Sequence, residues 1–147
     1  MIENGSSPNS DLVDFGMPPL SLAFDDPGCG HPVSNMEIAE VLTDHGADVN
    51  FGGRNKYPPL MAAMRSCNLD GLQFLVSKGA DVNARDAEGH SVIMYFSGGI
   101  DVAPCLKFLV QHGADIQVEA NDGRTAKSWA RSVNNKSALE YLNSLEP

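Results

Sequence analysis

The tripeptide Gly-Ala-Asp occurs three times in this chain, and its spacing constrains the fold more than any other feature. The copies begin at Gly46, Gly79 and Gly113, so they are separated by 33 and 34 residues. Two copies continue as Val-Asn and the third continues as Ile-Gln. A fixed period of this length is typical of solenoids, in which each repeat packs only on its neighbours. The spacing therefore predicts an all-α solenoid of about four helix-turn-helix repeats, connected by short β-turns.

Each repeat is predicted to contain two helices. The second helix precedes Gly-Ala-Asp, where apolar residues recur at helical spacing in residues 38–42, 72–76 and 106–110. The glycine then ends the helix, because glycine takes the left-handed conformation at little cost. A shorter first helix is predicted at Pro18-Pro19-Leu20, at Pro58-Pro59-Leu60 and near residues 91–93 and 125–127, since proline in a first helical turn loses no hydrogen bond.

With these features the chain resembles the ankyrin-repeat family. The family pattern runs Asp-x-x-Gly-x-Thr-Pro-Leu-His-x-Ala-Ala and, after a second helix, ends with Gly-Ala-Asp-Val-Asn. Residues 53–83 and 86–115 match it best, and residues from about 120 to 145 resemble a terminal cap. No repeat has the full Thr-Pro-Leu-His, and the histidine position is held by Ser21, Met61, Met94 and Ser128. The resemblance implies a module that binds proteins and has no catalytic activity, with turns less rigid than those of consensus repeats.

The domain organisation follows from the same pattern. We expect one ankyrin-repeat domain over residues 13–147, with repeats at about 13–50, 51–83, 84–117 and 118–145. Residues 1–12 are predicted to be a disordered N-terminal segment without the basic flank and apolar run of a signal peptide. No apolar stretch approaches the roughly 20 residues of a membrane span. The first repeat carries about seven extra residues, 27–33, and the third carries one near Gly98-Gly99.

The cysteines are expected to be unpaired. Cys29, Cys67 and Cys105 are odd in number and fall on separate repeats with no close pair in the sequence. A disulfide framework needs an even count at tight spacing. This usage favours a reducing compartment, so we expect the protein to be cytoplasmic.

The net charge of −9 lies at one end of the chain. Residues 1–50 contain nine acidic residues and no lysine or arginine, whereas residues 51–147 sum to zero. Binding to duplex nucleic acid is excluded as a direct role, because phosphate contacts need basic side chains. The asymmetry favours a protein partner with a basic surface. The alternative is an acidic surface that only keeps the protein soluble.

Candidate binding residues come from the concave surface of the family, transferred position by position. Tyr57, flanked by Arg54 and Arg65, has the composition of an interface hot spot. The adjacent carboxylates Asp25 and Asp26 are expected to orient a basic patch of the partner. Neither Tyr57 nor this acidic pair is expected to be needed for stacking of the repeats. The full set of predicted partner-binding residues is Met17, Asp25, Asp26, Arg54, Asn55, Tyr57, Met64, Arg65, Glu88, His90 and Arg124.

No motif in the chain favours catalysis, a cofactor or a metal. The sequence lacks Gly-x-Ser-x-Gly, a phosphate-binding glycine loop and His-Glu-x-x-His. Cys29 and His31 beside Asp25-Asp26 do not have the spacing of a zinc site, and a solvent-exposed loop is the preferred interpretation.

The sequence leaves two sharper binding roles open. One is a stoichiometric inhibitor or immunity protein that occludes a toxic enzyme such as a nuclease. The other is a scaffold or adaptor that joins two partners. We expect a monomer without membrane contact in either case.

Overall fold

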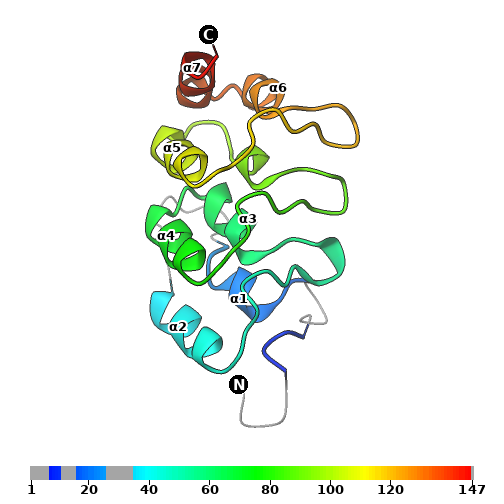
Figure 1. The fold of residues 1–147 in the computed structure, drawn as a ribbon, viewed down its shortest axis with the longest axis vertical. Helices are drawn as coiled ribbons and strands as arrows, with labels where there is room; N and C mark the ends of the chain where they lie inside the picture. Colours follow the sequence, from blue (N-terminus) through cyan, green and yellow to red (C-terminus); the bar gives the residue numbers. More distant parts are fainter. Residues whose placement is uncertain (1–6, 11–15, 26–34, 147) are drawn as a thin grey trace.

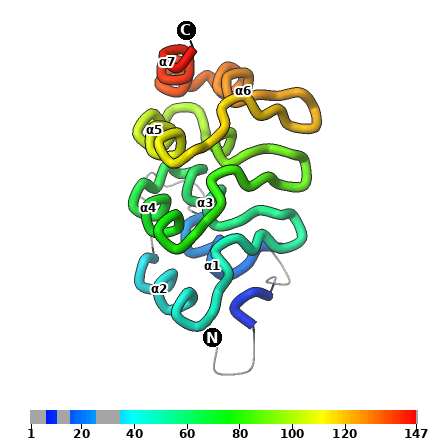
Figure 2. The backbone as a smooth tube through the Cα atoms, in the orientation of Figure 1, coloured from blue at the N-terminus to red at the C-terminus, as the bar shows by residue number. Residues whose placement is uncertain are grey.

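The computed structural model describes residues 7–10, 16–25 and 35–146, and the insertion at 27–33 and the Asp26 candidate lie outside them. The helices stack in layers along the long axis of the molecule (Figure 1). The connections between α2 and α3, between α4 and η2, and between α5 and α6 project to the same side (Figure 2). The elements of the described residues are α1 (Pro19–Leu22), α2 (Met36–Asp44), the 3-10 turn η1 (Gly53–Asn55), α3 (Pro59–Arg65), α4 (Leu69–Ser77), the 3-10 turn η2 (Val92–Met94), α5 (Ala103–Gln111), α6 (Ala126–Ser132) and α7 (Lys136–Ser144).

Two columns of helices make up the stack, and the prediction of an all-α repeat solenoid is confirmed. The first helices form one column, in which α3 packs between α1 and η2, and η2 packs against α6. The second helices α4, α5 and α7 pack in sequence as the other column. The extended backbone forms only an isolated antiparallel bridge between Arg85 and Ser91 within the described residues. None of the helices in this part of the chain is long and apolar enough to cross a membrane.

The predicted helix ends are present at all three Gly-Ala-Asp motifs. Gly46, Gly79 and Gly113 have φ angles of +89°, +93° and +92°. A Cβ atom at any of these glycines would meet nothing within 4 Å, so the left-handed backbone, and not lack of space, requires glycine. The alanine that follows donates back to the helix, as Ala80 N–H does to Leu75 O at 3.0 Å. Helix and turn are thereby joined in the same way in each repeat.

Asparagine side chains connect successive motifs. The Asn50 side chain donates to Gly79 O at 3.1 Å and accepts from Asp81 N–H at 2.8 Å. Asn83 makes the same two bonds one repeat later, to Gly113 O at 3.0 Å and from Asp115 N–H at 2.8 Å. Each amide satisfies a backbone acceptor and a backbone donor that the turn leaves open. The motif that revealed the repeat is therefore also a link between repeats.

Asn9 adds a step to this series at the N-terminal end. Its side chain donates to Gly46 O at 3.2 Å and accepts from Asp48 N–H at 2.7 Å. These are the bonds that Asn50 and Asn83 make to the following motif. Asn9 lies within the segment expected to be disordered, and its side chain bonds to the first Gly-Ala-Asp motif.

The first helix of the third repeat is reduced to a single 3-10 turn. The chain leaves η2 at Tyr95 and runs on to two glycines, and side chains of the fourth repeat bind the carbonyls that a longer helix would have used. Trp129 Nε1–H donates to Phe96 O at 3.0 Å. The Asn135 amide donates to Ser97 O at 2.8 Å and to Ile100 O at 3.0 Å. A Cβ on Gly98 would lie 2.1 Å from the carbonyl oxygen of Val133, so this segment and the fourth repeat meet backbone to backbone.

The expectation that Cys67 and Cys105 are unpaired is wrong. Their sulfur atoms are bonded, with the Cα atoms 5.7 Å apart. Cys67 lies in the turn between α3 and α4, and Cys105 lies in the first turn of α5. Stacking brings these positions together although 38 residues separate them, which a search for close cysteine pairs does not detect. Because disulfides persist in oxidising compartments, the cysteines no longer support a cytoplasmic location.

The second-helix leucines should carry much of the stability. Leu75 and Leu109 are both fully buried. We expect Leu75→Ala or Leu109→Ala to lower the free energy of unfolding by about 2–5 kcal/mol in urea denaturation, as truncations of buried leucines do. Val41→Ala is the control, because Val41 on α2 is 52% exposed. Equal losses for the buried and exposed positions would contradict this packing.

The disulfide should stabilise the middle of the stack. Closing a loop of this length restricts the unfolded chain, so reduction should lower the free energy of unfolding by about 2–4 kcal/mol. The measurement is urea denaturation with and without dithiothreitol, with peptide mapping of the cross-link. A Cys67→Ala/Cys105→Ala variant is the control and should not respond to the reductant. Coincident curves for the wild-type protein would show that the bond contributes nothing.

Candidate functional site

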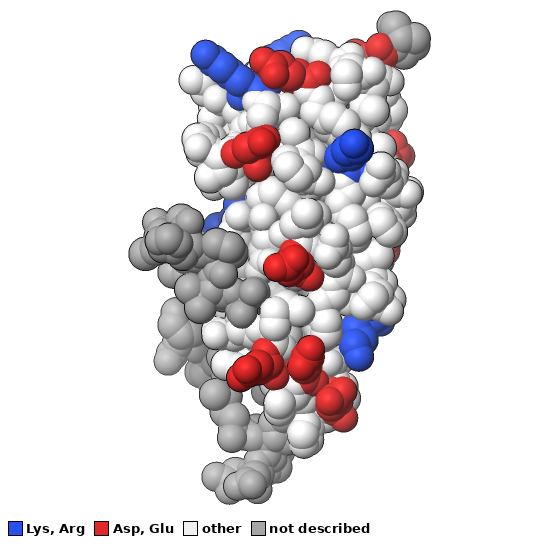
Figure 3. Space-filling view, turned by 90° about the vertical axis from the view of Figure 1, so that its left-hand side faces the viewer, with Lys and Arg blue, Asp and Glu red and all other residues white. Residues whose placement is uncertain are grey.

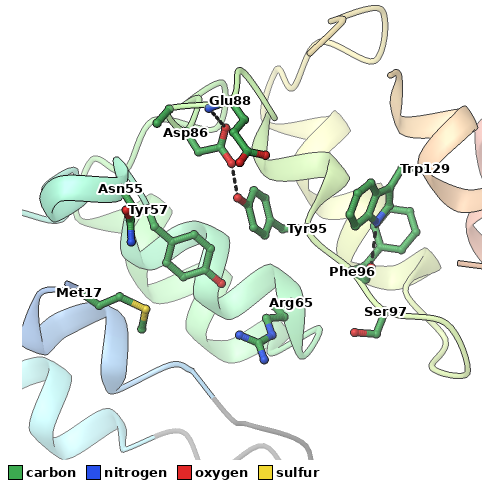
Figure 4. A pocket seen from close by; sticks show the side chains of 11 residues that line it. Met17, Asn55, Tyr57, Arg65, Asp86, Glu88, Tyr95, Phe96, Ser97 and Trp129 are labelled. Atoms are coloured by element: carbon green, nitrogen blue, oxygen red, sulfur yellow. Dashed lines mark hydrogen bonds between the residues drawn. The ribbon is translucent and has the colours of Figure 1, made fainter. Parts of the chain in front are cut away.

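A hollow of about 470 Å³ opens beside the column of first helices. Residues of four successive layers contribute to it, from the turn before α1 to α6 (Figure 4). One wall is the irregular segment after η2, where a longer helix would otherwise stand. We call it the aromatic hollow, and its lining residues are Met17, Asn55, Tyr57, Arg65, Asp86, Ala87, Glu88, Tyr95, Phe96, Ser97 and Trp129.

Tyr57 forms part of the wall and is mostly covered. The residue is 8% exposed, and its ring packs edge-on against Tyr95 with the centroids 5.1 Å apart. Burial, with a smaller effect of Asp25, raises the pKa of the Tyr57 hydroxyl to about 12, against an opposing effect of Arg65. Arg65 lies close enough for this influence, but the buried hydroxyl makes no hydrogen bond of regular geometry. The expectation that Tyr57 is dispensable for stacking is therefore wrong, because its ring is part of the packed interior.

Asp86 anchors the back of the hollow. Its carboxylate is 8% exposed and accepts hydrogen bonds from the Tyr95 hydroxyl, from Glu88 N–H at 2.9 Å and from His90 N–H at 2.8 Å. The His90 ring adds an ion pair at 3.1 Å between Nδ1 and Asp86 Oδ2. Burial alone would raise the pKa of Asp86, but the bonds from Tyr95 and His90 bring it below its ordinary value. Burial and the bond to Asp86 raise the pKa of Tyr95 well above its ordinary value, so the pair holds one proton, on the phenol.

Trp129 closes the hollow from the fourth repeat. Its indole N–H is held by Phe96 O, which fixes the ring relative to the segment after η2. The Arg124 guanidinium lies over the ring, 5.1 Å from the centroid, and is also paired with Asp122. Arg124 lines a smaller neighbouring hollow of about 200 Å³ and not the aromatic hollow itself.

The charges around the hollow are unequal. The Glu88 side chain is 77% exposed at the rim, with an oxygen 3.6 Å from His90 Nδ1. The guanidinium of Arg65 is the cation among the lining residues, and Asp25 pairs with it at 3.1 Å from Nη1 to Oδ1. The lining therefore contains two carboxylates, Asp86 and Glu88, and one cation that already has a partner.

The structure brings together only part of the predicted binding set. Met17, Asn55, Tyr57, Arg65 and Glu88 all line the aromatic hollow. Asp25 adjoins it through Arg65, Arg124 lies in the neighbouring hollow, and Arg54 is exposed on η1 without lining either.

Besides Tyr57, two of the predicted binding residues are buried. Met64 is fully buried and has no surface to offer a partner, because α1 and η2 cover α3 from both sides. His90 is 7% exposed, and its contacts to Asp86 hold it in the turn.

Sequence reasoning missed the residues that form most of the aromatic wall. Tyr95 and Trp129 are 34 residues apart, at the position that directly follows the histidine position of the family pattern. Their equivalent positions in successive repeats could have indicated that the two side chains lie on the same face. Phe96 and Ser97 had no such signal, because their place depends on the early end of η2. Within the described residues, no three histidine, cysteine or carboxylate side chains lie together as a metal site would require.

The opposite column of helices presents a different surface. Figure 3 shows acidic side chains gathered at the N-terminal end of this face, at the level of α2, and charges of both signs toward the C-terminal end. The exposed acids of α2 are Glu37, Glu40 and Asp44. The acidic asymmetry seen in the sequence is thus also present on the surface, away from the aromatic hollow.

Comparison with known proteins gives a consistent result. A family model of ankyrin repeats, in three copies, matches residues 1–86. Human ankyrin repeat and SOCS box protein 6 is 35% identical over 96 residues, which cover 60% of this chain and 21% of that protein. Alpha-latrocrustotoxin-Lt1a of Latrodectus tredecimguttatus is 34% identical over 89 residues, covering 60% and 6% of the two chains. An ankyrin repeat-containing protein of Schizosaccharomyces pombe is 34% identical over 83 residues, covering 56% and 39%. The chain therefore spans less than half the length of each of these relatives.

Tyr57 should respond differently to loss of its ring and loss of its hydroxyl. Tyr57→Ala should lower the free energy of unfolding by about 3 kcal/mol, because it leaves a cavity among buried side chains. Tyr57→Phe should raise it by up to about 1 kcal/mol, because it removes a buried hydroxyl without a partner. Urea denaturation at pH 7 measures both changes. A large loss in the phenylalanine variant would mean that the hydroxyl is bonded.

The same pair of proteins can be compared in alkaline solution. The pKa of Tyr57 is raised in the folded protein to about 12 from 10.0. The folded state therefore holds this proton more tightly, and its contribution to stability is complete below pH 10 and lost as the pH rises toward 12. The free energy of unfolding should fall less over this interval in Tyr57→Phe than in the wild-type protein. Parallel curves would contradict the raised pKa.

Proposed function

The chain belongs to the ankyrin-repeat family, and from that premise we propose that it binds a protein partner through the aromatic hollow and the turns beside it, without catalysis. Ankyrin repeats generally mediate protein–protein interaction. The observation that carries the proposal is the hollow itself, because it combines aromatic walls with exposed polar side chains at the rim. Tyrosine, tryptophan and arginine in a concave site are the residues that dominate interface energies.

The charge of the chain supports a partner with a basic surface. The protein carries a net charge of −9, and α2 exposes three acidic side chains. Such a field speeds the encounter with a basic protein and is screened by salt. An inhibitor that occludes a basic enzyme cleft, such as that of a nuclease, is the second candidate. The same acidic surface favours it, since carboxylates can take the place of substrate phosphates.

Site-specific cross-linking tests which face is used. A photoreactive p-benzoylphenylalanine at position 55 lines the hollow, and one at position 107 lies exposed on α5, on the other column. We expect adducts with a partner from native lysate at position 55 and none at position 107. Adducts only at position 107 would overturn the proposal.

The identity of the cross-linked material separates the possible roles. A single enzyme whose activity falls on binding would support the inhibitor, and a multi-protein assembly would support an adaptor. A Glu88→Lys substitution should reduce capture at position 55 by about tenfold, as loss of a complementary interface charge does. Lys107→Glu is the matched charge-reversal control on α5 and should leave capture unchanged.

A further inference from the structure

We propose that the aromatic hollow receives a cationic side chain, a lysine or an arginine, of the bound partner. This inference rests on the proposed function and specifies the chemistry of its site. Three features of the hollow identify the occupant. Its walls are aromatic, two negatively charged carboxylates line it, and its one lining cation, Arg65, is already paired with Asp25.

The walls present electron-rich rings to the space between them. Tyr57, Tyr95 and Trp129 come from three successive repeats and line the same hollow (Figure 4). The faces of such rings attract an ammonium or guanidinium group within about 6 Å of the centroid. The structure contains an internal example of this attraction, because the Arg124 guanidinium lies 5.1 Å from the centroid of Trp129 on the side of the neighbouring hollow.

The rings are also held in place before any ligand arrives. The Tyr95 hydroxyl donates to the Asp86 carboxylate, and the Trp129 indole donates to Phe96 O. The donors of Tyr95 and Trp129 are thus already used, whereas the hydroxyl of the third ring, Tyr57, is buried without a partner. Fixed aromatic walls reduce the entropy that binding would otherwise cost.

The carboxylates determine the sign of the occupant. Asp86 lies at the back of the hollow, and Glu88 lies at its rim with 77% of its side chain exposed. An anionic side chain would meet both carboxylates, while the Arg65 guanidinium that could attract it is already paired with Asp25. An apolar side chain would fill the space but would desolvate Glu88 without compensation. A long cationic side chain satisfies the rings and Glu88 together.

Trp129 is the one tryptophan of the chain, so its fluorescence reports on the hollow directly. The probes are N-acetyl-lysine amide and N-acetyl-arginine amide, with N-acetyl-norleucine amide as the uncharged analogue and N-acetyl-glutamate amide as the anion. We expect a saturable fluorescence change with the two cations, which weakens as salt is added, and no saturable change with the other two probes. Equal responses to the lysine and norleucine probes would overturn the proposal, and so would tighter binding of the glutamate probe.

A matched pair of charge variants locates the effect. Glu88→Gln should weaken binding of the cationic probes by about threefold or more, as loss of one partly exposed ion pair does. Glu119→Gln removes an exposed carboxylate that does not line the hollow and should leave the affinity unchanged. Equal effects of the two variants would show that the probes respond to the overall charge, which would overturn the assignment to this hollow.

The probe experiment needs no partner, so its failure is distinct from failure of the proposed function. Cross-linking at position 55 without any probe selectivity would retain partner binding at this face and reject the cationic occupant. If the hollow bound the cationic probes selectively but no partner cross-linked at position 55, the hollow would bind cations, and a side chain of a protein partner would be rejected as its occupant.

Discussion

The hydrogen bonds from asparagine side chains to the next Gly-Ala-Asp motif hold the solenoid in register. Each amide bonds to a glycine carbonyl and an aspartate N–H of the following repeat, so the distance between turns does not depend on apolar packing alone. Apolar contacts are non-directional and would allow one layer to slide over the next. The two hydrogen bonds of each amide are directional, so sliding would break them. The projecting turns, and therefore the walls of the aromatic hollow, inherit their spacing from this series.

The regular parts of the fold were predictable because each depends on a local signal. A glycine with a positive φ angle ends a helix at Gly46, Gly79 and Gly113, and a proline begins one at Pro19 and Pro59. The burial of Tyr57 and Met64 was not predictable in this way, since the family pattern gives the position of a residue in a repeat and not how closely its neighbours cover it. The bond between Cys67 and Cys105 joins turns of different repeats, so it depends on the stacking and not on sequence separation.

The candidate site arises where the repeat is least regular. The third repeat has a single 3-10 turn in place of a first helix, and the segment that follows is stabilised by Trp129 and Asn135 of the next repeat. A regular helix at that position would have filled part of the hollow. The same irregularity places Tyr95, Phe96 and Ser97 on its wall. The departures from the family pattern therefore mark the candidate site better than the matches to it do.

The cross-link between Cys67 and Cys105 also affects how the molecule opens. In a linear stack, unfolding starts at an end and passes from one interface to the next. The disulfide joins the second and third repeats. Unfolding that starts at an end therefore cannot separate these two repeats while the bond is intact. The second helices at the two ends bury few side chains, since α2 buries Ala39 and Leu42 and α7 buries Ala138 and Leu142. The protein thus combines a clamped centre with two end layers that both contribute to the aromatic hollow, Met17 from the N-terminal layer and Trp129 from the C-terminal layer, so fraying at either end opens one of its walls.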